Sequence, residues 1–153
     1  MIMKKFIYLL ATLFLVSLSA CSPEEDDIFG QTSAERIEEV MKADLNVLTG
    51  ASNGWLMSYY PAQAQKYGGY NVLVKFTDEG KVTVASDIVD ATATATSTFR
   101  LKEQAGPTLT FDTYNKIFHI FSDPKNELGI GNDGLGMEGD YEFTIMSATA
   151  ENG

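Results

Sequence analysis

The chain has 153 residues, a formal net charge of −10 and a single cysteine. That length suits one domain with one hydrophobic core. The acidic balance argues against nucleic acid and anionic membrane surfaces as partners, because proteins bind both through clustered Lys and Arg. A single cysteine excludes a disulfide framework and a thiolate zinc site.

The first residues have the pattern of a bacterial export signal. Two lysines precede an apolar run over residues 6–18. The run is too short for a membrane span, which takes about 20 apolar residues to cross roughly 30 Å of hydrocarbon. The order Leu-Ser-Ala-Cys at 18–21 matches the lipobox of bacterial lipoproteins, whose cysteine is acylated; an ordinary signal peptide cut after Ala20 is the alternative. The sequence therefore predicts a signal peptide over 1–20 and a lipid bilayer as partner through acylated Cys21.

Residues 21–31 are predicted to be an acidic tether. Glu24 to Asp27 are four consecutive like charges, which repel one another and resist collapse. In Bacteroidota lipoproteins, acidic residues just after the lipidated cysteine resemble a signal for the outer face of the outer membrane. A plain spacer is the alternative. We expect a lipid-anchored outer-membrane protein exposed on the cell surface.

The next segment is predicted to be an amphipathic helix. Thr32 and Glu35 have the spacing of a capping box. Apolar residues then recur at intervals of three and four up to Gly50, as they do on one face of a helix. This stripe consists of Ile37, Val40, Met41, Leu45 and Leu48. We expect the helix to pack on a sheet.

From residue 55 onward the apolar period changes to two, which is typical of strands. The predicted strands run through 55–59, 70–76, 82–84, 99–101, 109–111, 117–121 and 141–145. Turns are predicted at 77–80 and 106–107, and the Ala/Thr run over 91–98 is interpreted as a loop. The fold class is therefore α+β and mostly β: an antiparallel meander over 32–153 with the N-terminal helix packed on it.

The last residues, Glu151-Asn152-Gly153, contain the strongest short hairpin signal, Asn-Gly. No return strand follows, and a sheet left so would expose an edge. We therefore expect this sequence to be the N-terminal portion of a longer domain.

Four separated segments carry a family resemblance. They are 54–61 (GWLMSYYP), 67–76 (YGGYNVLVKF), 106–115 (GPTLTFDTYN) and 139–146 (GDYEFTIM). Together they resemble the Bacteroidota lipoproteins of domain of unknown function family 4302, from the lipobox to the last residue. The resemblance implies a longer protein with further strands and no established activity, so no catalytic residue is carried over. It also implies a gene beside outer-membrane nutrient-uptake systems with a TonB-dependent transporter, and hence a binding or accessory role by association.

The glycine-rich loop over 126–139 carries two weak patterns. Gly129 to Gly134 fits G-x-G-x-x-G by letter, but its flanks cannot supply the strand and helix that dinucleotide binding needs. Oxygen ligands of the type that Ca²⁺ prefers also gather here, without EF-hand spacing: Asp123, Asn126, Asn132, Asp133, Glu138 and Asp140. We interpret the loop as a polar surface segment and expect no cofactor and no metal site.

His119 is the only histidine in the chain. No G-x-S-x-G elbow exists to pair with it in a hydrolytic triad. Its two-residue spacing from Ile117 and Phe121 predicts that it fills one face of a strand. We expect no catalytic residues and no enzymatic activity. A hydrolase with paired carboxylates is the less favoured alternative, because such pairs are not recognisable in a single sequence.

Five aromatic residues surround the first predicted hairpin: Trp55, Tyr59, Tyr60, Tyr67 and Tyr70. Aromatic rings stack on sugars and also fill sheet cores, and core packing is the favoured interpretation. Strand alternation places Tyr70 inside with Val72, so either Tyr60 or the Trp55–Tyr59 pair must face away from the helix.

The candidate ligand-binding residues are Trp55, Tyr60 and Tyr67, and the candidate ligand is a glycan. We expect a ligand-binding or accessory module of a nutrient-uptake system. The alternative is a structural or interaction subunit of an outer-membrane complex.

Overall fold

The computed structural model describes residues 30–125 and 127–149. The predicted signal peptide, the predicted lipidation site Cys21, most of the predicted tether, Asn126 and the predicted Asn-Gly turn lie outside these residues. The elements are α2 (Ser33–Gly50), β1 (Trp55–Tyr59), β2 (Tyr70–Phe76), β3 (Lys81–Ser86), β4 (Ala95–Glu103), β5 (Pro107–Phe111), the 3-10 helix η2 (Phe118–Phe121) and β6 (Glu142–Thr144).

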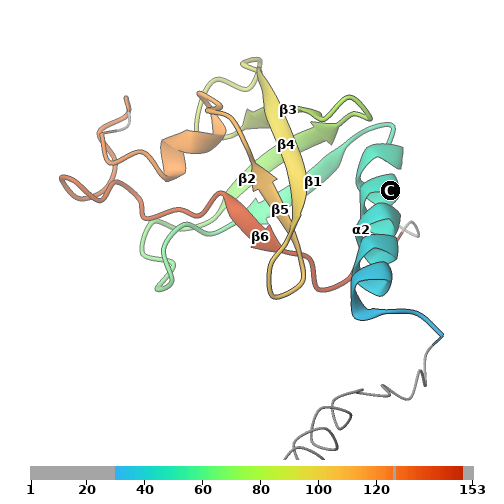
Figure 1. The fold of residues 1–153 in the computed structure, drawn as a ribbon. Helices are drawn as coiled ribbons and strands as arrows, with labels where there is room; N and C mark the ends of the chain where they lie inside the picture. The colour runs from blue at the N-terminus through green and yellow to red at the C-terminus, as the bar shows by residue number, and fades with distance from the viewer. Residues whose placement is uncertain (1–29, 126, 150–153) are drawn as a thin grey trace, which may run out of the picture. The chain divides into compact units, whose positions relative to one another are not determined.

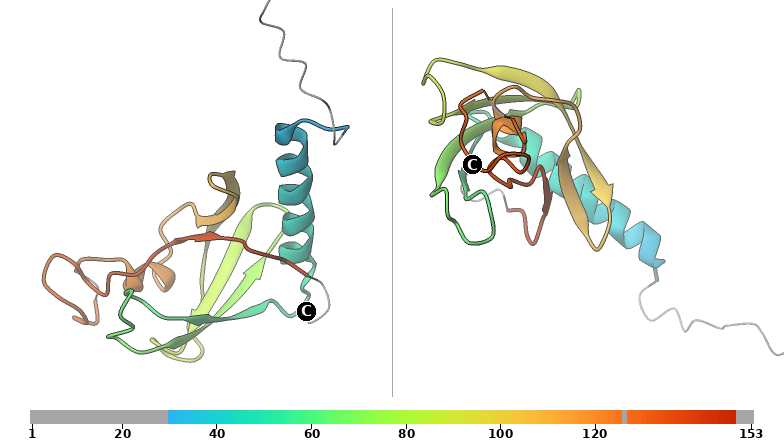
Figure 2. Two further views of the ribbon diagram at one scale, coloured as in Figure 1. Left: turned by 90° about the horizontal axis from the view of Figure 1, so that it is seen from below. Right: turned by 90° about the vertical axis from the view of Figure 1, so that its left-hand side faces the viewer.

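The six strands form one antiparallel meander in the order β1-β2-β3-β4-β5-β6. Figure 1 shows that the sheet is curled, with α2 along one side and η2 at the opposite end. The two further views in Figure 2 agree with this placing. The predicted fold class, a mostly β domain with its N-terminal helix packed on an antiparallel meander, is confirmed.

Helix α2 begins directly after the predicted cap residue Thr32 and ends at Gly50, as predicted. The indole Nε1 of Trp55 donates to the backbone oxygen of Leu48 at 2.9 Å and joins the end of the helix to β1. The predicted apolar stripe is partly wrong. Val40 and Leu45 are exposed, whereas Asp44 is buried and burial raises the pKa of its carboxyl.

The core lies inside the curl of the sheet. Side chains alternate along β2 and β3, so that Val72, Val74, Val82 and Val84 point inward and their neighbours point out. Aromatic rings from η2 close the open end of the curl. The ring of Phe118 stacks on Phe111 with a centroid distance of 3.8 Å and an interplanar angle of 11°.

The prediction of a strand over 117–121 is wrong, because this segment forms η2. The side chain of Asn115 explains the difference. Its Oδ1 accepts the backbone N–H groups of Ile117 and Phe118, both at 3.1 Å, and its Nδ2 donates to the Ala95 oxygen at 3.2 Å and the Ser97 Oγ at 3.1 Å. Such local bonds compete with a strand ladder and favour a turn.

The interpretation of 91–98 as a loop is wrong in its second half, because β4 begins at Ala95. Ala95 and Ser97 are buried and face the core. On the outer face, the hydroxyls of Thr83 and Thr96 lie 3.0 Å apart across β3 and β4. The small inward residues of β4 leave the space that the buried Asn115 occupies.

Strands β1 and β6 are the two ends of the sheet, so each pairs with a strand on one side only among the described strands. Aromatic side chains reach across between them, with the Tyr59 and Phe143 ring centroids 5.8 Å apart. Along residues 30–125 and 127–149, no helix has the length and apolar character needed to cross a membrane.

Candidate functional site

A cleft of about 740 Å³ lies beside β1, an end strand of the sheet that the described residues form. One side consists of β1 from Met57 onward and of Tyr60, Ala62 and Gln63 after it. The other side consists of Glu138, Asp140 and Phe143, from the segment that leads into β6. A concave site with a few polar groups around an apolar wall is the usual form of a small-ligand site.

Tyr60 supplies the open aromatic face of this cleft. It follows β1 with the outward phase, opposite to the buried Tyr59, and 53% of its surface is exposed. Its ring lies over Gly69, where an added Cβ would come within 2.5 Å of the ring Cε1. A side chain on residue 69 would therefore displace the ring from this position.

Three contacts join the segment 59–67 to the segment 136–140, at the cleft and next to it. The Tyr59 Oη donates to the Asp140 backbone oxygen at 2.9 Å, and the Tyr67 Oη donates to that of Gly136 at 3.2 Å. The Lys66 Nζ and a Glu138 carboxylate oxygen form an ion pair at 2.5 Å. Both partners of this pair are well exposed to water, so it orients the two loops more than it stabilises them.

These contacts perturb two titrating groups. The hydrogen bond to Glu138 raises the pKa of the Lys66 ammonium, and the neighbouring Tyr67 adds to the shift. Burial raises the pKa of the Tyr59 phenol, and the negative charge of Asp140 raises it further. Tyr59 is therefore held in its neutral form, in which it donates to the opposite side of the cleft.

Both loops of the cleft contain backbone strain. Among the described residues, the non-glycine positions with positive φ are Ala62 (64°), Gln65 (52°) and Glu138 (56°). Two of them line the cleft, and Gln65 lies in the same loop as Ala62. A side chain in this conformation costs about 1–2 kcal/mol, and such strain gathers at functional sites. Its concentration here marks the cleft as a candidate site.

The structure does not bring the three predicted ligand residues together. Only Tyr60 lines the cleft. Trp55 is half-buried against the core, with its indole N–H donated to Leu48, and Tyr67 is half-buried, with its hydroxyl donated to Gly136. Tyr70 packs inward as predicted, with its ring centroid 5.0 Å from that of Phe121.

Sequence reasoning missed the polar groups of the cleft. Gln63 carries no motif, and Glu138 and Asp140 were grouped with possible Ca²⁺ ligands. Within 30–125 and 127–149, no three His, Cys, Asp or Glu side chains gather as a metal site would require. Gly139, between Glu138 and Asp140, is a sequence feature that could have indicated a close approach of this segment to another part of the chain. A Cβ on Gly139 would lie 2.6 Å from the Tyr59 Oη, so this glycine allows the segment to approach β1 closely.

The loop that fits G-x-G-x-x-G folds back on itself. The backbone N–H of Asn132 donates to the Gly136 oxygen at 3.1 Å, and that of Leu135 donates to Asn132 at 3.0 Å. In the part of the chain that the structure describes, β6 is the next element after this loop. The loop therefore lacks the following helix whose N-terminus would face a pyrophosphate.

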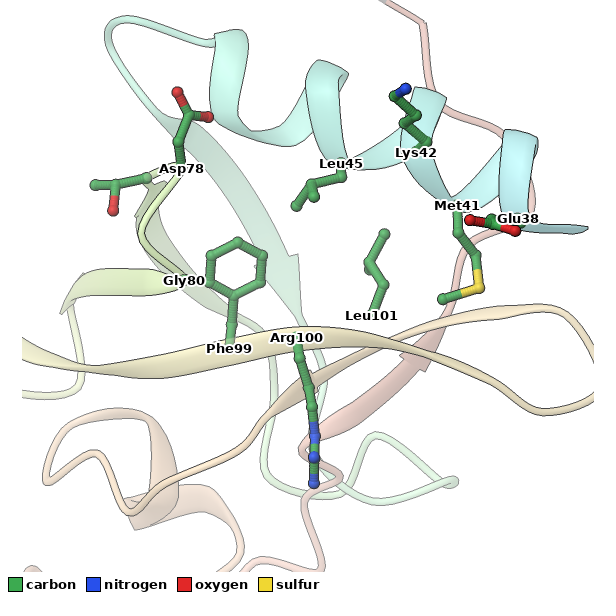
Figure 3. Close-up of a pocket in the computed structure, with 10 residues that line it drawn as sticks. Glu38, Met41, Lys42, Leu45, Asp78, Gly80, Phe99, Arg100 and Leu101 are labelled. Carbon is green, nitrogen blue, oxygen red and sulfur yellow. The ribbon is translucent and has the colours of Figure 1, made fainter.

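A second hollow, of about 500 Å³, lies between α2 and β4. In Figure 3, the side chains of Met41, Leu45, Phe99 and Leu101 converge, whereas Lys42 and Arg100 point away from them. The Arg100 guanidinium is bound to Asp112 at 2.6 Å. The converging side chains are apolar, so this hollow is mainly a packing joint between helix and sheet, and the cleft beside β1, with Gln63, Glu138 and Asp140 in its lining, is the better candidate site.

No curated protein and no solved structure matches this chain. One family matches residues 25–153, which is most of the chain. The chain therefore belongs to the family described as domain of unknown function DUF4302.

Proposed function

We propose that this protein is a lipid-anchored outer-membrane lipoprotein of the cell surface, and that its domain binds a saccharide in the cleft beside β1. Its role is that of a binding or accessory module in nutrient uptake, not of an enzyme. The observation that carries the proposal is Tyr60, an exposed ring supported from behind by Gly69 and surrounded by polar side chains.

The chemistry of the cleft matches the two kinds of surface on a sugar ring. The C–H face of a pyranose is apolar and packs on an aromatic face. Its hydroxyls need directional partners, and Gln63 and the carboxylates of Glu138 and Asp140 line the same cleft. The carboxylates accept hydrogen bonds from sugar hydroxyls, and the Gln63 amide both donates and accepts.

The first residues of the chain support the proposed location at the cell surface. The lipobox ending at Cys21 and the acidic residues after it support acylation and surface export in a Bacteroidota outer membrane. Several acyl chains on one residue give a lasting anchor, since each buried methylene contributes about 0.8 kcal/mol. A TonB-dependent transporter is the partner that the family resemblance favours.

The anchor is tested by Cys21→Ala in cells grown with an alkyne fatty acid. The wild-type protein should take the label and remain with the membrane fraction. The variant should lose the label and become soluble. A variant that is still labelled would end the lipoprotein assignment.

The cleft is tested on a glycan array with the wild-type protein and Tyr60→Ala. Leu56→Ala is the matched control, because Leu56 is also exposed, has the same outward phase as Tyr60 and does not line the cleft. Tyr60→Ala should lose the array signal while its melting temperature stays unchanged, and Leu56→Ala should keep both. A wild-type protein that binds no glycan contradicts the proposal.

One observation favours an interaction subunit as the second candidate. Leu56 and Leu73 are partners across β1 and β2, and they are 64% and 56% exposed on the outer face of the sheet. Neighbouring exposed leucines are typical of a surface that another protein covers. Under this alternative, Leu56→Asp and Leu73→Asp would reduce co-purification of a transporter from crosslinked outer membranes, whereas Tyr60→Ala would not.

A further inference from the structure

A second aromatic surface lies outside the cleft and consists of Tyr114, His119 and Tyr141, here named the aromatic strip. The centroid of the His119 ring is 5.2 Å from that of Tyr114 and 5.6 Å from that of Tyr141. The imidazole and Tyr141 rings are inclined by only 29°. Tyr114 is 65% exposed and Tyr141 is 46% exposed, so both end members present ring surface to solvent.

The strip is held by backbone that is hydrogen-bonded to the core. The buried Asn115 side chain fixes the start of η2, and the backbone N–H of His119 donates to the Asn115 oxygen at 2.9 Å. The backbone oxygen of Tyr141 accepts the N–H of Phe111, the last residue of β5, at 3.1 Å. Two segments, 114–119 and the one that contains Tyr141, therefore hold the three rings in contact on supports anchored in the core, which lowers the entropy that a ligand must overcome.

One polar group of the strip has a fixed hydrogen-bonding role. The backbone N–H of Asn115 donates to the His119 Nδ1 at 3.0 Å, so the neutral ring carries its proton on Nε2. Neither tyrosine hydroxyl makes a hydrogen bond with another described residue. Aromatic faces with neutral donors and acceptors at their edges suit a ligand that has apolar C–H faces and hydroxyl groups.

We infer that the aromatic strip is a second saccharide-binding surface, separate from the cleft at Tyr60, on which a neutral oligosaccharide stacks against Tyr114 and Tyr141. It does not depend on the cleft, because none of its three rings lines that cleft. The segment 138–141 supplies Glu138 and Asp140 to the cleft and Tyr141 to the strip. Two contact surfaces on one small domain would hold a long polysaccharide at two places and increase its retention through effective concentration.

The only histidine of the chain gives a direct readout. The imidazole resonances of His119 are followed by NMR while the protein is titrated separately with maltohexaose, cellohexaose and xylohexaose, and with choline as a cationic control. At least one hexasaccharide should shift these signals in a saturable way. Tyr114→Ala and Tyr141→Ala should each weaken that response by about tenfold, the equivalent of losing about 1.4 kcal/mol of stacking. Tyr60→Ala should leave the response unchanged.

Melting curves separate a binding role from a purely structural one. Both tyrosines are well exposed, so their alanine variants should remain folded at the wild-type melting temperature. The inference is overturned if no hexasaccharide shifts the His119 signals, if choline alone shifts them, or if Tyr60→Ala removes the shift. In the last case the cleft would bind the sugar and the strip would not.

Discussion

The Tyr60 ring and the Gly69 backbone are in direct contact, at a distance that leaves no room for a methyl group on residue 69. Residue 60 follows β1 and residue 69 precedes β2, so this contact closes the loop between the two paired strands. The glycine therefore has a steric function: it lets the exposed Tyr60 ring lie close against the backbone at residue 69. The position of this ring is the basis of the first prediction.

Gly69→Ala should displace the Tyr60 ring and weaken saccharide binding. The new methyl group meets the far end of a flexible side chain, so the ring moves and the sheet does not. We expect a clear loss of affinity in a binding titration and a nearly unchanged melting temperature. Gly50→Ala is the matched control, because a Cβ there meets nothing within 4 Å. Wild-type affinity in Gly69→Ala would show that the ring position does not matter.

Tyr59→Phe should loosen the cleft without disturbing the core. It removes the hydrogen bond from the Tyr59 hydroxyl to the Asp140 oxygen and keeps the ring contacts with Phe118, Phe121 and Phe143. The expected loss is about 1 kcal/mol in the free energy of unfolding, measured by urea denaturation. Tyr60→Phe, at an exposed position, should cost nothing measurable. Equal stability of the two variants would contradict the role assigned to this bond.

Much of the fold could be predicted from periodicity. The switch from a three-to-four to a two-residue period at Trp55 is local information, and it placed α2, β1, β2 and the turn at Gly80 correctly. The segment 117–121 shows the limit of such patterns. A short apolar run fits a strand or a buried turn equally well. Here the hydrogen bonds of Asn115 favour the turn, and its partners on β4 are distant in sequence.

The candidate site was harder to predict for the same physical reason. Alternation along β1 predicts that either Tyr60 or the Trp55–Tyr59 pair faces away from the helix. The structure shows that Tyr60 is the exposed one. Its polar neighbours Glu138 and Asp140 come from the far end of the chain. They lie next to β1 because the Tyr59 hydroxyl bonds to Asp140 and because Gly139 lets the two segments approach closely. Neither contact produces a periodic pattern in the sequence, so neither could be predicted from it.

Asn115→Ala should be among the most destabilising single substitutions in this domain. The side chain is buried and makes four hydrogen bonds, so its removal leaves donors and acceptors of η2 and β4 without partners. We expect a loss of roughly 3 kcal/mol in the free energy of unfolding. The control is Asn71→Ala, at an exposed asparagine bound to Asp87, which should cost far less. Similar losses in both variants would mean that Asn115 does not fix η2.

Stability should fall on mild acidification because of His119. Burial lowers the pKa of its imidazole below the unfolded value of about 6.5. The unfolded chain therefore binds a proton at a higher pH than the folded chain. The contribution of the neutral ring is complete above about pH 6.5 and is lost as the pH falls toward the folded pKa.

Melting temperatures measured between about pH 5.5 and 7.5 test this, since no other side chain of ordinary pKa titrates there. The wild-type protein should melt at a lower temperature at the acid end of this range. His119→Gln, which does not titrate, should show a flatter profile. Identical profiles for the two proteins would contradict the assignment.

The most direct test of the proposed function is a calorimetric titration of the wild-type protein, Tyr60→Phe and Tyr60→Ala with the saccharide that gives the strongest array signal. If stacking on the Tyr60 ring carries the binding, Tyr60→Phe keeps nearly the wild-type affinity because the ring remains. Tyr60→Ala should then bind at least about tenfold more weakly, a loss of roughly 1.4 kcal/mol. Equal affinity of all three proteins, with all three folded, would contradict a saccharide site at Tyr60.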